Sequence, residues 1–255
     1  MCFWLMWDRM RRLLPLINMK KNRLIYIATG IVVILALLVG IEKSMCYEAL
    51  GDAQIAMVTD DAVAVTETNR YIFFDGPSEK SGLVFYPGAF VDADAYAPLL
   101  HEMAAEGMDC FAIKMPFDFA LLNTYAANVV LDNYEYEDWY MAGHSLGGVA
   151  AGRYCSGNMD KIDGLLLLAS YVIDPVNTKD GFVVTSIYGS EDAVLKLDQL
   201  EQNKEYLPDD CTTVAIEGGN HGQFGDYGQQ KGDGEATITT KEQIDKTIEI
   251  WFDCL

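Results

Sequence analysis

The sequence predicts an α/β fold with a mostly parallel central sheet and helices on both faces. Short, almost continuously apolar runs alternate with segments of helical periodicity from about residue 60 to the end of the 255-residue chain. Strands that are apolar along their whole length are typical of parallel sheets covered by helices. The composition agrees, because 51% hydrophobic residues supply a large packed core. The expected strands are residues 83–86, 110–113, 139–142, 162–169, 182–188 and 212–216.

The alternation opens with a predicted hairpin and closes with a predicted helix. Residues 62–66 and 71–74 have the pattern of two strands joined by a turn. Only about a dozen residues separate Ser170 from the next strand, so no large cap is expected over the sheet. The expected helices are residues 96–106, 121–131, 149–154 and 240–252.

An uncharged, strongly apolar run occupies residues 24–41. As a helix it would be about 27 Å long, close to the hydrocarbon thickness of a bilayer of about 30 Å. Residues 1–23 are basic, which places the N-terminus in the cytoplasm and the rest of the chain outside. We expect an uncleaved transmembrane signal anchor, since no small-x-small cleavage site follows the run. Signal cleavage and secretion is the alternative.

Two further boundaries follow from this organisation. Residues 42–61 are the expected juxtamembrane connector, and residues 62–255 are the expected α/β domain. Basic residues follow Met19 directly, as at the start of a signal anchor. We therefore expect Met19 to be the initiator and residues 1–18 to be absent from the native protein.

The charge and the cysteines exclude several classes of function. The chain carries a net charge of −20, and residues 44–255 alone carry −25. Such a domain repels phosphate backbones, so nucleic acid is not an expected partner. Six cysteines without C-x-x-C spacing predict neither a zinc site nor a disulfide framework, although one bridge between Cys211 and Cys254 stays open. No metal or other cofactor is expected.

The sequence Gly143-His144-Ser145-Leu146-Gly147 lies between the apolar run 139–142 and a helical segment. The pattern G-x-S-x-G at a strand-to-helix junction is the nucleophile elbow of serine hydrolases. The turn is so sharp that side chains at the flanking glycines would collide with neighbouring backbone. We predict that Ser145 is the nucleophile and that its backbone is strained.

A serine nucleophile needs a base within hydrogen-bond reach, and the chain has three histidines. His144 belongs to the elbow, with its side chain expected to point away from the serine, and His101 lies within a predicted helix. His221 follows the strand 212–216 on a glycine-rich loop, where α/β sheets place functional residues. We predict that His221 is the general base.

An acid that orients the histidine should lie between the serine and the histidine in sequence. Asp192 is preferred because it lies just past the predicted strand 182–188. Asp174, after the preceding strand, and the neighbouring Glu191 are the alternatives.

The oxyanion of the tetrahedral intermediate needs preorganised donors. The backbone N–H of Leu146 is one candidate, at the start of a helix whose dipole also helps. The N–H of Ala89, in the loop after strand 83–86, is the other, with Gly88 allowing a turn there. The expected substrate-pocket residues are Phe117, Phe119 and Phe224.

Taken together, these motifs resemble the alpha/beta-hydrolase superfamily, in particular the small fold-5 group near dienelactone-hydrolase-like esterases. The resemblance implies the alpha/beta-hydrolase fold and a triad of Ser145, Asp192 and His221, in agreement with the assignment from the residues. A substrate does not transfer with a fold. The matching stretches cover about three-quarters of the chain and are residues 83–89, 114–117, 143–148, 167–171, 188–192 and 218–225.

The sequence therefore predicts a membrane-anchored, extracytoplasmic serine hydrolase of the carboxylesterase type. We expect it to cleave ester-type bonds, lactone or amide bonds included, in a small-molecule substrate through an acyl-enzyme. Without a large cap, the site should be open and suited to modest esters. A cell-envelope acyltransferase or peptidase and a non-catalytic surface-binding module are the alternatives. The identity of the substrate and the oligomeric state are not predicted.

Overall fold

The structure is a computed structural model that describes residues 26, 29, 40, 46–78, 80–176 and 179–255. The chain divides into two units, Met1–Met45 and Cys46–Leu255, and the second holds the fold described below. The predicted anchor, residues 24–41, falls almost entirely outside the described residues, as do residues 1–23. Within the described part of the chain, no helix is both long enough and apolar enough to span a membrane.

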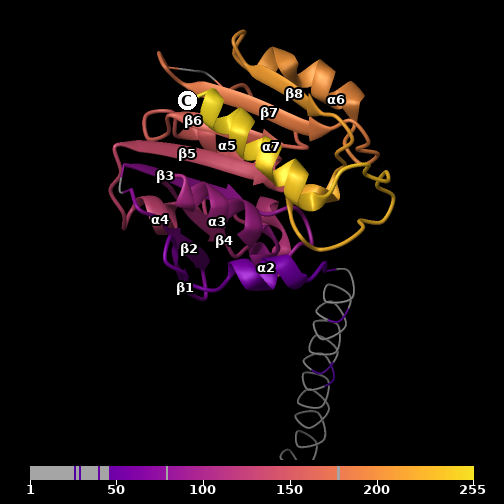
Figure 1. The fold of residues 1–255 in the computed structure, drawn as a ribbon. Helices are drawn as coiled ribbons and strands as arrows, with labels where there is room; N and C mark the ends of the chain where they lie inside the picture. The colour runs from indigo at the N-terminus through magenta and orange to yellow at the C-terminus, as the bar shows by residue number, and fades with distance from the viewer. Residues whose placement is uncertain (1–25, 27–28, 30–39, 41–45, 79, 177–178) are drawn as a thin grey trace, which may run out of the picture. The chain divides into compact units, whose positions relative to one another are not determined.

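One sheet organises the second unit (Figure 1). Its strands are β1 (Ala64–Glu67), β2 (Tyr71–Asp75), β3 (Ser81–Tyr86), β4 (Met108–Ile113), β5 (Asp138–His144), β6 (Gly164–Leu168), β7 (Val183–Gly189) and β8 (Thr212–Ile216). They lie in the order β1-β2-β4-β3-β5-β6-β7-β8. Strands β3 to β8 pair in parallel, whereas β1 and β2 form an antiparallel hairpin that joins β4 antiparallel. The predicted mostly parallel sheet and opening hairpin are confirmed.

The sheet is buried on both faces because alternate side chains of its central strands enter two separate cores. Leu83 and Phe85 of β3 belong to one core, and Val84 and Tyr86 belong to the other. Helices α3 and α7 contribute to the first core, and α4 and α5 contribute to the second. The helices are α2 (Gly51–Ala56), α3 (Ala97–Ala105), α4 (Asn128–Leu131), α5 (Leu146–Gly157), α6 (Leu197–Gln202) and α7 (Thr240–Asp253).

The helix predicted over residues 121–131 is wrong. The segment forms only the short turn η3 (Ala120–Leu122) and the single-turn α4. A side chain from the sheet is the physical reason, because the buried Tyr86 hydroxyl donates to the Thr124 carbonyl and accepts from the Ala127 N–H, each at 2.8 Å. These bonds satisfy backbone groups that a continuous helix would have paired internally.

The cysteines of the described residues are all unpaired, so the bridge between Cys211 and Cys254 is not formed. Cys110 and Cys155 are buried in the two cores, as small apolar side chains are. Burial raises the pKa of both thiols and keeps them protonated.

Residues of the predicted connector pack on the α/β domain. The backbone of Tyr47 forms two hydrogen bonds with the loop after β3. Its N–H donates to the Phe90 carbonyl at 2.7 Å, and its carbonyl accepts from the Asp92 N–H at 3.1 Å. Its hydroxyl also accepts from the N–H of Lys231 at 3.0 Å, in the loop after β8. One side chain and its backbone therefore contact two loops at the same edge of the sheet.

Candidate active site

The candidate catalytic residues all lie at the carboxyl edge of the parallel sheet. Ser145 directly follows β5, Asp192 follows β7, and His221 follows β8. Ala89 follows β3, which is the neighbour of β5. Because parallel strands end at one edge, the topology brings together residues that are far apart in sequence.

Ser145 has the strained backbone that its motif predicts. Its φ of 51° and ψ of −123° are adopted by few residues other than glycine. Its N–H donates to the Leu168 carbonyl at 2.9 Å, and its own carbonyl accepts from the Ser170 hydroxyl at 2.7 Å and from the Gly148 N–H at 3.0 Å. These bonds on both sides of the residue hold the unusual conformation.

The glycines of the elbow are required by close backbone approach. A Cβ on Gly143 would lie 2.5 Å from the backbone of Gly147, and a Cβ on Gly147 would lie 2.1 Å from the Tyr86 carbonyl oxygen. The first turn of α5 therefore touches the end of β3. This contact brings the amide after the nucleophile next to the loop that carries Ala89.

Asp192 and His221 form a buried pair. Nδ1 of His221 lies 2.8 Å from Oδ2 of Asp192, and the two side chains are 1% and 0% exposed. The other oxygen of Asp192 accepts from the N–H groups of Val194 and Leu195, at 2.8 and 2.7 Å. An ionised carboxylate only accepts, so Nδ1 carries the proton and Nε2 is the basic nitrogen of the neutral ring.

The two alternative acids are engaged elsewhere. Asp174 accepts from Nε of Arg153 at 2.8 Å, and the exposed Glu191 accepts from the Ser190 hydroxyl at 3.1 Å. Within the described residues, Asp192 is the carboxylate that bonds the His221 ring.

The second nitrogen of His221 is buried and has no hydrogen-bond partner among the described residues. Leaving a buried polar atom unpaired costs about 1–3 kcal/mol and calls for a functional explanation. His221 lines a cavity of about 120 Å³ that Ser145 also lines. No hydrogen bond joins Nε2 to the serine hydroxyl, a bond that in free hydrolases is often long and tightens only with substrate.

The two amides predicted to bind an oxyanion lie in adjacent segments. Leu146 is the first residue of α5, so its N–H points out of the helix start. Ala89 is two residues beyond Pro87, whose carbonyl oxygen would lie 2.3 Å from a Cβ on Gly147. Within the described part of the chain, neither amide donates a hydrogen bond. Both N–H groups are therefore available to a ligand.

Gly88 is needed for a different reason than the expected turn. A Cβ at this position would lie 2.8 Å from Nδ1 of His144 and 2.9 Å from the Tyr96 hydroxyl. The residue of this loop with a positive φ is instead Phe90, at 58°.

The aromatic residues predicted for the pocket are not among those that line this cavity. Phe117 is 58% exposed, the Phe119 ring packs 5.7 Å from Phe90, and the fully buried Phe224 ring packs 5.7 Å from His144. Other lining residues directly follow β6 or the Asp192 turn and were not predicted, although their place just past strand ends could have indicated them. The lining residues are Ser145, Leu146, Val149, Ala169, Ser170, Tyr171, Val194, Leu195, Lys196 and His221.

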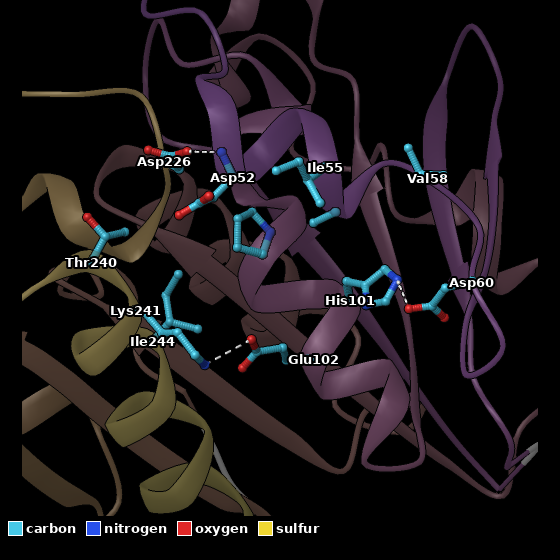
Figure 2. A pocket seen from close by; sticks show the side chains of 12 residues that line it. Asp52, Ile55, Val58, Asp60, His101, Glu102, Asp226, Thr240, Lys241 and Ile244 are labelled. Carbon is cyan, nitrogen blue, oxygen red and sulfur yellow. Dashed lines mark hydrogen bonds and ion pairs between the residues drawn. The ribbon is translucent and has the colours of Figure 1, made fainter.

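A larger hollow of about 500 Å³ is lined by residues of α2, α3 and α7 (Figure 2). An ion pair joins Glu102 and Lys241 at 3.3 Å along it, and Nε2 of His101 lies 3.6 Å from a carboxylate oxygen of Asp60. None of the candidate catalytic residues lines it, so its size does not make it the reaction site.

Among the described residues, one group of side chains could bind a metal ion through its sulfur and oxygen atoms, namely Cys46, Asp92 and Asp118. The thiol donates to the Asp92 carboxylate at 3.1 Å and to that of Asp118 at 3.4 Å. Burial, followed by these acceptors and their charges, raises the pKa of the Cys46 thiol. The thiol is the hydrogen-bond donor to both carboxylates, and it would bind a metal ion only as the thiolate.

The sequence profile of the Alpha/beta hydrolase family matches residues 82–245, more than half of the chain. The chain belongs to this family. It is therefore a hydrolase, and the resemblance of its motifs to the alpha/beta-hydrolase superfamily is confirmed. A search of curated proteins found no match to this alpha/beta hydrolase.

Solved structures share its fold over almost their whole length. TT1662 from Thermus thermophilus is 16% identical with a TM-score of 0.55, covering 75% of this chain and 97% of that one. Est1E from Butyrivibrio proteoclasticus is 14% identical with a TM-score of 0.52, covering 76% and 98%. The carboxylesterase CesB (YbfK) from Bacillus subtilis is 10% identical with a TM-score of 0.53, covering 80% and 94%. At these identities the likeness establishes the fold.

Gly147→Ala should disrupt the elbow, because the new methyl group would meet the Tyr86 carbonyl oxygen at 2.1 Å. We expect the free energy of unfolding to fall by about 3 kcal/mol or more, measured by urea denaturation. Gly157→Ala, at the other end of α5, is the control, since its Cβ would meet only the Tyr125 hydroxyl at 3.6 Å. Similar losses in the two variants would contradict the close approach of α5 to β3.

Proposed function

We propose that this alpha/beta hydrolase is a serine esterase, with Ser145 as nucleophile, His221 as base and Asp192 as orienting acid. One observation carries the proposal. The His221 ring is held by a buried carboxylate through Nδ1, and its unpartnered Nε2 belongs to a residue that lines the same cavity as Ser145. Because Nδ1 is bonded to the carboxylate and Nε2 is unpartnered, Nε2 of His221 can take the proton of the Ser145 hydroxyl.

In this mechanism the Ser145 oxygen attacks the carbonyl carbon of the ester while Nε2 of His221 takes its proton. The amides of Leu146 and Ala89 donate to the oxyanion, and Asp192 stabilises the imidazolium. When the tetrahedral intermediate collapses, the leaving alcohol takes the proton from His221. Water then attacks the acyl-enzyme by the same route, which releases the acid and restores the serine hydroxyl.

The size of the cavity supports a small acyl or alcohol group as its occupant. Its volume of about 120 Å³ is below that of a dry cavity of about 150 Å³ that admits benzene. Sites for larger ligands typically measure about 300–1,000 Å³. The carboxylesterase CesB shows that this fold can carry ester hydrolysis, so esters are the first substrates to test.

Labelling with a fluorophosphonate probe tests the nucleophile. We expect wild-type protein to be labelled and to hydrolyse p-nitrophenyl butyrate, and Ser145→Ala to lose labelling and at least about 10⁴-fold in kcat. Ser156→Ala is the control, because this serine lies on α5 and its hydroxyl donates to the Gly152 carbonyl of the same helix, at 3.1 Å. Folded wild-type protein that is not labelled would instead favour a non-catalytic binding module.

A series of p-nitrophenyl esters tests the size of the acyl group. Acetate and butyrate esters should have a higher kcat/KM than the palmitate ester, because a long chain exceeds the volume of the cavity beside Ser145. A preference for long acyl chains would contradict this part of the proposal.

We also propose that residues 24–41 anchor the enzyme in a membrane with the hydrolase domain outside the cytoplasm. The uncharged apolar run and the basic residues before it support this orientation. The full chain should stay in the membrane fraction after an alkaline carbonate wash, and protease added to intact cells should degrade the domain. Release of a domain that lacks residues 24–41 would favour signal cleavage and secretion.

A further inference from the structure

A chain of buried hydrogen bonds joins the loop after β3, the end of β5 and the loop after β8. The Gly88 N–H donates to the Tyr96 hydroxyl at 3.0 Å, and that hydroxyl lies 2.8 Å from Nδ1 of His144. Nε2 of His144 lies 3.0 Å from the carbonyl oxygen of His221. Tyr96 is 0% and His144 is 1% exposed, so water does not compete for these bonds.

The His221 carbonyl fixes the direction of every bond in this chain. A carbonyl oxygen only accepts, so Nε2 of His144 carries the proton. Burial, and secondly the neighbouring His221, lower the pKa of His144, so its ring is neutral and Nδ1 is unprotonated. The hydroxyl of Tyr96 therefore donates to Nδ1 and accepts from Gly88. Every polar group in the chain is satisfied in this one arrangement.

Packing around these bonds leaves little space for rearrangement. The ring centroids of His144 and His221 are 4.6 Å apart, and those of Phe85 and Tyr96 are 4.7 Å apart. A single methyl group on Gly88 would already approach Nδ1 of His144 to 2.8 Å. The hydrogen-bonded groups are therefore held by van der Waals contact as well.

We propose that Tyr96 and His144 are positioning residues that fix the proposed oxyanion amide of Ala89 and the base His221 relative to the nucleophile. The inference rests on the proposed function. Gly88 directly precedes Ala89, His144 directly precedes the serine, and the last acceptor is the backbone of the base itself. Loss of a bond in this chain leaves every catalytic group present and displaces these groups relative to one another. A displacement of about 1 Å in such a site can cost about 100-fold in rate.

A role in core packing alone makes a different prediction. Loss of the buried hydroxyl would then lower the stability and the amount of folded protein. Each folded molecule would keep its turnover rate. Turnover per active site, counted by fluorophosphonate titration run to completion, separates the two roles.

Tyr96→Phe removes one oxygen atom and leaves the Gly88 N–H and Nδ1 of His144 without a partner. We expect kcat per titrated site to fall about 10–100-fold and KM to stay within about twofold, because the lost alignment acts in the transition state. Tyr154→Phe is the matched control, since it removes a hydroxyl that bonds Asn128 at 2.7 Å in the other core. This control should keep the wild-type turnover per site.

Substitution of His144 gives a second comparison, which decides the question even if Tyr96→Phe does not fold. His144→Gln keeps an amide donor for the His221 carbonyl, whereas His144→Leu removes it. We expect kcat per titrated site to be at least about fivefold higher for the glutamine variant, the effect of one ordinary hydrogen bond.

Equal turnover of Tyr96→Phe and Tyr154→Phe, or of the glutamine and leucine variants, would overturn the positioning role. Wild-type protein that is folded but is not labelled at Ser145 would instead contradict the proposed function, and the positioning role with it. The two failures are therefore distinguishable in one set of measurements.

Discussion

Contact between the first turn of α5 and the end of β3 sets the geometry on which the rest of the site depends. Gly147 lies so close to the Tyr86 carbonyl that no side chain fits between them. The contact places the start of the α5 helix beside the loop after β3, directly after the strained backbone of Ser145. Ser145 donates a hydrogen bond to Leu168 of β6 and accepts one from the Ser170 hydroxyl, and these bonds hold the nucleophile in its strained conformation.

Much of the fold could be predicted because its central strands are almost continuously apolar and end in recognisable turns. Ser145 is predicted from the G-x-S-x-G motif. Asp192 and His221 are predicted from their order in the sequence and from their places after strands, because function gathers at the carboxyl edge of a parallel sheet. The structure adds the bond between Asp192 and His221, which sequence order could suggest and only geometry can provide.

The remaining features depend on contacts that leave no local pattern. The helix predicted over residues 121–131 is interrupted by the hydroxyl of Tyr86, a residue on a distant strand. Tyr96 ends the short turn η1 (Ala93–Tyr96), and nothing around it in the sequence indicates that it bonds His144. The sequence predicts that Gly88 allows a turn. The structure instead requires a glycine there because the side chains of Tyr96 and His144 leave no space for a Cβ.

The direction of the hydrogen bonds from Gly88 to His221 has a consequence for how this site can change. The first donor is the peptide N–H of Gly88, which does not give up its proton. This series of hydrogen bonds therefore cannot conduct protons, and its groups act as aligned dipoles. Replacing Tyr96 or His144 alone leaves the other side chain without its partner in the buried bond between them. Replacing both with apolar side chains removes that donor and that acceptor together, and leaves the Gly88 N–H and the His221 carbonyl unpaired. The two positions are therefore coupled across 48 residues of sequence. The cost of replacing both should therefore be smaller than the sum of the two single costs.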